Sequence, residues 1–168
     1  VMSGMDLPLA VMILIPEPWA NNSLMSQKKK DFYQYYATMM EPWDGPASIL
    51  FSDGDIMGAV LDRNGLRPSR YYITDDDYLI LSSEVGVLDI DPTKIVVKER
   101  LRPGKMLLVD TVKGRVIDDD ELKETYAGKQ PYGEWIDRNL LNLKDLKIPN
   151  QRVPEYTKEE RQRMQKAF

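Results

Sequence analysis

Three arginines lie in one short segment, residues 62–70, between two predicted strands. The Asn64-Gly65 pair within it favours positive φ, so the chain can turn sharply there and present its side chains. Arg63, Arg67 and Arg70 could then hold a carboxylate through paired N–H donors. The alternative interpretation is a tight turn that is fixed by an internal pair between an arginine and a carboxylate.

The remaining polar motifs are typical of turns and helix ends. Ser82-Ser83-Glu84 puts hydroxyls beside a carboxylate, but a serine nucleophile needs a positioned base and an oxyanion hole. The aspartates at 53–55 and 75–77 lack the alternating ligands and closing glutamate of a calcium loop, and they predict turns. Those at 118–120 predict a helix N-terminus, where negative charge is favourable. We therefore expect no metal site and no catalytic group in these segments.

The composition excludes several classes of chemistry. The chain has no cysteine and no histidine, so its residues supply no thiolate nucleophile, disulfide, iron–sulfur ligand or Ser–His pair. Its 23 basic and 27 acidic side chains give a net charge of −4, which does not favour nucleic acid or an anionic membrane as a partner. The longest apolar run, residues 7–15, contains Pro8 and is far shorter than the roughly 20 residues of a membrane helix.

The hydrophobic pattern predicts the elements that position these residues, and they make an α+β fold. Short β-type runs separated by turn residues, such as Asp53-Gly54, predict a largely antiparallel meander over residues 47–117. Capped segments with apolar residues at helical spacing flank it on both sides. The expected strands are 48–51, 56–61, 71–74, 78–81, 95–98, 106–110 and 115–117, and the expected helices are 7–15, 26–40, 118–126, 131–143 and 157–168.

Three surface features complete the prediction. The run Lys28-Lys29-Lys30 is typical of a solvated turn of helix. Trp19 and Trp43 lie beside prolines, where an aromatic side chain covers the edge of a core or lines a pocket. The helix predicted from Thr157 begins with caps and charges but lacks an apolar partner, so we expect the chain to be truncated there.

Several strings along the chain resemble one family, the large chains of glutamate synthase. Arg63-Asn64-Gly65-Leu66-Arg67-Pro68 is the most specific of these strings. A looser Asp-x-x-Gly-x-Arg-Pro followed by Ser-Glu is shared by class II glutamine amidotransferases in general. The resemblance runs over essentially the whole chain, in residues 3–4, 7–8, 16–19, 40–47, 58–68, 82–87, 101–104, 106–110 and 165–168.

This resemblance implies an N-terminal-nucleophile hydrolase fold of four αββα layers, of which the chain would form part. In the family, an N-terminal cysteine attacks the amide of glutamine and its own α-amine acts as the base. Ammonia then passes to a flavin site, where 2-oxoglutarate becomes glutamate. The resemblance further implies FMN, an iron–sulfur cluster and NADPH or ferredoxin as electron donor, and a location in the cytoplasm or the plastid stroma. We expect none of these cofactors on this chain.

The chain departs from the family at the nucleophile. It contains no cysteine, and Val1 has no side-chain heteroatom. The resemblance places the family's nucleophile, glutamine-binding arginine, oxyanion Asn-Gly and substrate-binding aspartate upstream of this sequence. The Asn64-Gly65 pair belongs to a different motif, so we assign no catalytic residue. Asp62, Asn64, Gly65 and Arg67 are expected to act as scaffold near the site.

The expected organisation follows from the same resemblance. Residues 1–130 would be the C-terminal portion of the amidotransferase domain, and 131–168 a closing helix and linker towards a central domain. Its partners would be the upstream half of that domain and the downstream synthase domains, with glutamine as the substrate of the whole enzyme. Alone, the chain would be inactive and would expose sheet edges and apolar faces.

Two alternatives remain open. The chain would be a non-catalytic module that grips a carboxylate ligand with Arg63, Arg67 and Arg70, or one half of a split enzyme whose nucleophile lies on another chain.

Overall fold

The computed structural model describes residues 2–146 and 155–167. The chain forms two compact units, residues 1–138 and 139–168. The first unit contains all seven strands found in the described residues and the helices that pack on them.

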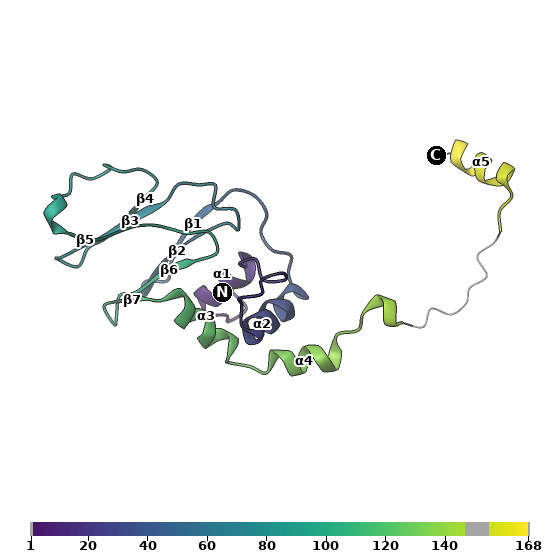
Figure 1. Cartoon of the computed structure of the whole chain (residues 1–168), viewed down its shortest axis with the longest axis horizontal. Helices are drawn as coiled ribbons and strands as arrows, with labels where there is room; N and C mark the ends of the chain where they lie inside the picture. The colour runs from purple at the N-terminus through teal and green to yellow at the C-terminus, as the bar shows by residue number, and fades with distance from the viewer. Residues whose placement is uncertain (1, 147–154, 168) are drawn as a thin grey trace. The chain divides into compact units, whose positions relative to one another are not determined.

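The strands of the first unit form two antiparallel sheets (Figure 1). The four-stranded sheet has the order β1-β2-β6-β7, and the three-stranded sheet has the order β4-β3-β5. Their bounds are β1 Ser48–Ser52, β2 Ile56–Leu61, β3 Arg70–Thr74, β4 Leu79–Ser82, β5 Ile95–Arg100, β6 Met106–Asp110 and β7 Arg115–Ile117. The strand positions and the α+β class predicted from the sequence are therefore confirmed.

The predicted meander is wrong in its pairing. The hairpins β1-β2, β3-β4 and β6-β7 form as expected, but β5 pairs with β3 rather than β4, and β6 returns to β2. Turn residues determine where a chain reverses, not which earlier strand it joins afterwards. Two sheets result because β3, β4 and β5 pair only among themselves in the described chain.

Four helices belong wholly or mainly to the first unit, and their predicted starts are confirmed. They are α1 Leu7–Leu14, α2 Gln27–Ala37, α3 Asp119–Ala127 and α4 Tyr132–Asn139. The Ser26 hydroxyl caps α2 by accepting from Lys29 N, and the Asp118 carboxylate caps α3. The remaining helical segments are the 3₁₀ turns Pro92–Lys94 and Leu143–Asp145 and the helix α5 Lys158–Lys166.

Helix α4 ends four residues earlier than predicted. Its expected continuation would have buried Leu140 and Leu143, but both side chains are exposed. Without a core to cover, apolar residues at helical spacing do not extend a helix. Helix α5 begins with a capping box in which Thr157 and Glu160 satisfy each other's backbone N–H, and all its described residues are exposed. Phe168, the end of the predicted last helix, lies outside the described residues.

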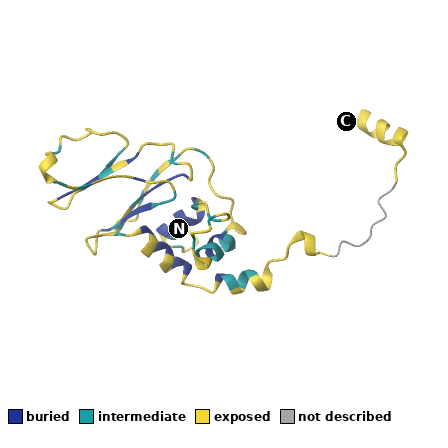
Figure 2. Ribbon diagram, in the orientation of Figure 1, coloured by how far each residue is buried: buried dark blue, intermediate teal, exposed yellow. Residues whose placement is uncertain are grey.

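The main core lies between the helices and one face of the four-stranded sheet. Figure 2 shows its buried residues in dark blue on α1, α2, α3 and the central strands. Phe32 of α2 is completely buried and its ring meets that of Tyr132 of α4 edge-on, 5.4 Å between centroids. A smaller cluster lies on the opposite face, where Ala59, Leu61 and Leu107 meet Leu101 and side chains of the three-stranded sheet.

The prediction of a solvated lysine turn at 28–30 is wrong for Lys29. Its ammonium pairs with Asp120 Oδ1 at 3.0 Å and with Glu124 Oε1 at 3.5 Å, so it links α2 to α3. Burial lowers the pKa of this ammonium, but the two carboxylates outweigh it and raise the pKa above its usual value.

Candidate functional site

Two chain segments cross between the sheets, and they lie against each other. Residues 62–69 lead from β2 to β3 and residues 101–105 lead from β5 to β6; together they are here called the double crossing. Leu101 N donates to Ser69 O at 3.0 Å. Gly65 has a φ of +60°, and a Cβ on it would lie 2.2 Å from Pro103 Cγ. Glycine is therefore required at position 65 by both its backbone conformation and its contact.

The carboxylate of Asp62 fixes the first crossing. Asp62 is 3% exposed; its Oδ1 accepts from Ala47 N at 3.0 Å, and its Oδ2 accepts from Asn64 N at 2.9 Å and Gly65 N at 3.3 Å. Burial raises the pKa of the Asp62 carboxyl, but the backbone donors outweigh burial and bring its pKa below the usual value. The turn is thus held mainly by a carboxylate on backbone amides, and the arginine–carboxylate pair that the sequence suggested forms as well, between the exposed Arg63 and Asp44.

A buried lysine fixes the second crossing. Lys123 of α3 is 3% exposed; its ammonium pairs with Glu17 Oε1 at 3.0 Å and Asp119 Oδ2 at 2.9 Å, and it donates to Gly104 O. Asp119 Oδ1 in turn accepts from Met106 N at 2.7 Å. Because the Cβ of Glu17 would lie only 3.1 Å from a Cβ on Gly104, residues 16–19 also touch this crossing. Three of the strings that carry the family resemblance therefore meet at one place.

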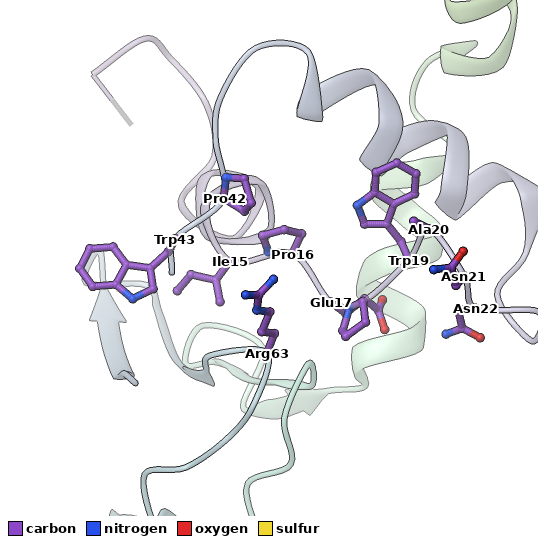
Figure 3. A pocket seen from close by; sticks show the side chains of 11 residues that line it. Ile15, Pro16, Glu17, Trp19, Ala20, Asn21, Asn22, Pro42, Trp43 and Arg63 are labelled. Carbon is purple, nitrogen blue, oxygen red and sulfur yellow. The ribbon is translucent and has the colours of Figure 1, made fainter. Parts of the chain in front are cut away.

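A hollow of about 490 Å³ opens beside the first crossing, and it is here called the tryptophan hollow. Figure 3 shows the Arg63 side chain between Trp43 and Glu17, with Pro16 next to it. Arg63 Nη2 pairs with Asp44 Oδ1 at 3.2 Å, and both side chains are exposed. Trp19 and Trp43 line this hollow, as one of the two predictions for them had it. Its wall includes two tryptophans, three prolines, the cation Arg63 and the carboxylate Glu17, which is already paired with Lys123. Such a surface is suited to binding a ligand.

A second hollow, of about 410 Å³, lies at the other end of the same crossing and is here called the serine hollow. Its lining residues are Ser48, Leu50, Arg67, Pro68, Ser69, Leu81, Ser82 and Ser83. The three arginines of the motif are therefore not brought together. Arg63 lines the tryptophan hollow, Arg67 lines the serine hollow, and Arg70 lines neither, standing at the start of β3 opposite Arg100.

The other sequence candidates take structural positions. Ser82 Oγ donates to Glu84 O and so closes its own turn. Asp53 and Asp77 lie in turns, and Asp118 caps α3. Across residues 2–146 and 155–167, no three His, Cys, Asp or Glu side chains are grouped so that they could hold a metal ion.

Sequence reasoning missed the buried charges that hold the second crossing. Asp119 was predicted only as part of a helix N-terminus, and Lys123 and Glu17 were not singled out. The one available signal was the Asp119–Lys123 spacing of four residues, which places both side chains on one face of α3. That spacing is common on exposed helices, so it does not indicate burial. Nearby, burial and the charge of Glu17 raise the pKa of the Tyr33 hydroxyl well above its usual value.

None of the helices in the described parts of the chain is long and apolar enough to cross a membrane.

Two kinds of comparison with known proteins identify relatives of this chain. The family model of class II glutamine amidotransferases matches residues 1–135. The glutamate synthase [NADPH] large chain of Bacillus subtilis is 51% identical over 143 residues, which is 85% of this chain and 9% of that protein. Ferredoxin-dependent glutamate synthase 1 of Arabidopsis thaliana is 46% identical over 171 residues, which is 100% of this chain and 10% of that protein.

A third relative, the glutamate synthase [NADH] of Schizosaccharomyces pombe, is 52% identical over 141 residues, 84% of this chain and 7% of that protein. The chain thus spans a tenth or less of the length of these curated relatives. These matches lead to one conclusion: the chain belongs to the class II glutamine amidotransferase family.

Proposed function

We propose that this chain is the C-terminal part of the glutaminase domain of a glutamate synthase, together with the start of its linker. The whole enzyme would hydrolyse glutamine and pass the ammonia on for the conversion of 2-oxoglutarate to glutamate. The matched family and the names of the relatives support this proposal. The boundary between domain and linker is proposed at residue 130.

The role proposed for these residues is that of a scaffold, and one observation carries it. The N–H groups of Asn64 and Gly65 both donate to Asp62 Oδ2. An oxyanion hole needs donors that are aimed at the reacting oxygen. Because these two donors are occupied within their own turn, the Asn64-Gly65 pair is suited to shape the chain rather than to stabilise a tetrahedral intermediate.

The nucleophile must then come from residues outside this sequence. The chain has no cysteine, so none of its own side chains can act as the family's thiolate. Asp62, Asn64, Gly65 and Arg67 would support the site indirectly, through the double crossing. The compartment that belongs to this proposal is the cytoplasm, or the plastid stroma in a photosynthetic eukaryote.

The sheet offers a surface on which the rest of the domain would pack. On the four-stranded sheet Ile49 and Phe51 point to the helix core, whereas the alternate residues Leu50 and Met57 are 62% and 55% exposed. Val116, which aligns with Met57 across β6, is exposed as well. Apolar side chains in a row on one sheet face are typical of a face that another layer covers. We propose the upstream half of the domain as that layer, and the synthase domains as the further partners.

The cofactors of the proposed parent enzyme find no ligands here. An iron–sulfur cluster is held by cysteine thiolates, and this chain has none. No glycine-rich phosphate loop that could hold the phosphate of FMN occurs in the sequence. Electron donors are named only for the relatives, as NADPH, NADH or ferredoxin. We propose that flavin, cluster and donor sites lie in other parts of the parent.

The test is glutamate release from glutamine by the chain alone, mixed with a separately made upstream segment that bears the N-terminal cysteine, and fused behind that segment. We expect no release by the chain alone and release by the mixture or the fusion. Release by the chain alone would overturn every role assigned above. A folded fusion that releases no glutamate would overturn the scaffold role.

A pair of variants in the fusion sharpens this test. Asp62→Asn should lower glutamate release, because it disturbs the turn that the carboxylate holds. Asp55→Asn, in the exposed β1–β2 hairpin, is the matched control and should leave release unchanged. Equal rates in the two variants would show that the first crossing does not support the site.

A further inference from the structure

We propose that the serine hollow binds a small aliphatic carboxylate, which Arg67 and Ser69 hold while an apolar wall receives its carbon chain. This binding site goes beyond the proposed scaffold function, but it is not independent of the proposed packing surface, because Leu50 belongs to both. It also differs from a grip by three arginines, since only Arg67 of the three lines this hollow.

Ser69 provides the first argument. The residue is 2% exposed and lines the hollow, and its backbone O accepts from Leu101 N across the double crossing. Its Oγ takes part in no hydrogen bond within the described ranges of the chain. The hydroxyl is not fully enclosed by protein, because Asp119 Oδ2 is the one fully buried side-chain oxygen or nitrogen without a hydrogen-bond partner in the described residues. It is therefore open to a partner in the hollow. A carboxylate oxygen in the hollow would supply the acceptor that this hydroxyl lacks.

Arg67 provides the second argument. Its side chain is exposed at the hollow and forms no ion pair with any described residue, whereas Arg63 of the same turn is paired with Asp44. No aspartate or glutamate is among the residues that line the hollow. The positive charge of the Arg67 guanidinium therefore has no acidic partner in the hollow, and the group offers two parallel N–H donors to a carboxylate.

The wall of the hollow indicates the rest of the ligand. Leu50, Pro68 and Leu81 give it an apolar surface next to the guanidinium and the hydroxyl. Its volume of about 410 Å³ lies in the range of small-molecule sites. An inorganic anion would leave this apolar surface wet, so an aliphatic chain that ends in a carboxylate fits better than phosphate.

The experiment titrates the full 168-residue chain with hexanoate, and with hexanamide and inorganic phosphate as ligand controls, while amide and methyl NMR shifts are recorded. A ligand this small is expected to bind in the millimolar range, so titration runs to about 20 mM. Hexanoate should shift Leu50, Leu81 and Ser69 signals, and the neutral amide should bind at least about tenfold more weakly. Absence of hexanoate shifts at these residues, or equal binding of phosphate, would overturn the proposal.

Three variants locate the site. Arg67→Gln should weaken hexanoate binding at least about tenfold, and Ser69→Ala a few-fold, because each removes a hydrogen bond to a charged group. Arg70→Gln, an exposed arginine of the same motif outside the hollow, is the matched control and should leave binding unchanged. Circular dichroism checks that each variant folds. If Arg67→Gln does not fold, the hexanoate binding of Ser69→Ala tests the proposal instead. Binding that a folded Arg67→Gln or Ser69→Ala variant retains in full would overturn the assignment.

Discussion

The two sheets of the first unit are built from similar short antiparallel strands, yet they are supported very differently. The four-stranded sheet packs α1, α2 and α3 on one face and contributes Val60, Met106 and Leu108 to the larger core. The three-stranded sheet contributes only Tyr71, Leu79 and Leu81, all half-buried, to the smaller cluster. The three-stranded sheet is thus attached to the rest of the unit by the smaller apolar cluster and by the double crossing.

This difference teaches where the family's specific residues are needed. A sheet under three helices is stabilised by apolar area, which many sequences can supply. A sheet with little apolar support needs its connections fixed in detail, and here that is done by a buried carboxylate, a buried lysine and two glycines. The most specific of the family-like strings, residues 63–68, lies at these connections, whereas others, such as residues 106–110, run through the larger core.

The largest effect is expected in the larger core. Phe32→Ala should lower the free energy of unfolding by about 4–5 kcal/mol, because the ring is completely buried and leaves a cavity. Leu79→Ala in the three-stranded sheet should cost only about 1–2 kcal/mol, because the side chain is half-buried. Urea unfolding measures both values. Equal losses would show that the two sheets are equally supported.

The next effect concerns the buried lysine. Lys123→Met should lower the free energy of unfolding by about 2–3 kcal/mol, because the half-buried Glu17 would lose its cation and the buried Asp119 would keep only Lys105. Lys113→Met is the matched control: its ammonium is exposed and pairs with Asp110 in a turn, so its loss should change stability far less. Thermal unfolding compares the two variants, and similar shifts would contradict the role of Lys123 at the crossing.

The sequence was sufficient for most of the local structure. Hairpin turns such as Asp53-Gly54 and caps such as Ser26 and Asp118 act within a few residues, so their patterns predicted strand and helix starts closely. The partners of β5 and β6 were not predictable, because they depend on which apolar faces meet across about 20–30 residues of chain for β5 and about 50 for β6.

The sequence predicted a turn at the candidate site, but it did not predict the contact between the two segments of the double crossing. Asn64-Gly65 indicated positive φ, and Gly65 adopts it. Nothing in the sequence showed that Pro103 lies against this glycine or that Asp119 and Lys123 are buried. Contacts between residues far apart in sequence have no local pattern, and charged residues at a helix start are usually exposed.

Alanine substitutions at two glycines distinguish the cost of a left-handed backbone from the cost of a steric contact. Gly65 and Gly114 have nearly the same φ, +60° and +63°, but a Cβ on Gly65 meets Pro103 whereas one on Gly114 meets nothing within 4 Å. Gly114→Ala should therefore cost about 1 kcal/mol from the left-handed conformation alone. Gly65→Ala should cost about 2–3 kcal/mol, since Pro103 must also move. Equal costs in urea unfolding would mean that the two crossings can separate freely.

The smallest effect is that of the Asp62 carboxylate, and it depends on pH. Because its pKa in the folded chain lies below the unfolded value near 3.9, the ionised carboxylate stabilises the fold above about pH 4. That contribution is lost as the pH falls through the folded pKa. Asp62→Asn should cost about 1–2 kcal/mol at neutral pH, because an amide cannot accept on both sides.

A comparison with Asp53, an aspartate in an exposed hairpin, tests whether burial increases the contribution of the Asp62 hydrogen bonds to the free energy of unfolding. Asp53 Oδ1 accepts from Asp55 N and Ile56 N much as Asp62 accepts from its own turn, but it does so at an exposed hairpin. Asp53→Asn should thus change stability far less, because water can reach the freed amides. In unfolding measured from pH 3 to 7, the gap between wild type and Asp62→Asn should narrow below about pH 4. A gap that stays constant with pH would assign the effect to shape rather than to the charge on the carboxylate.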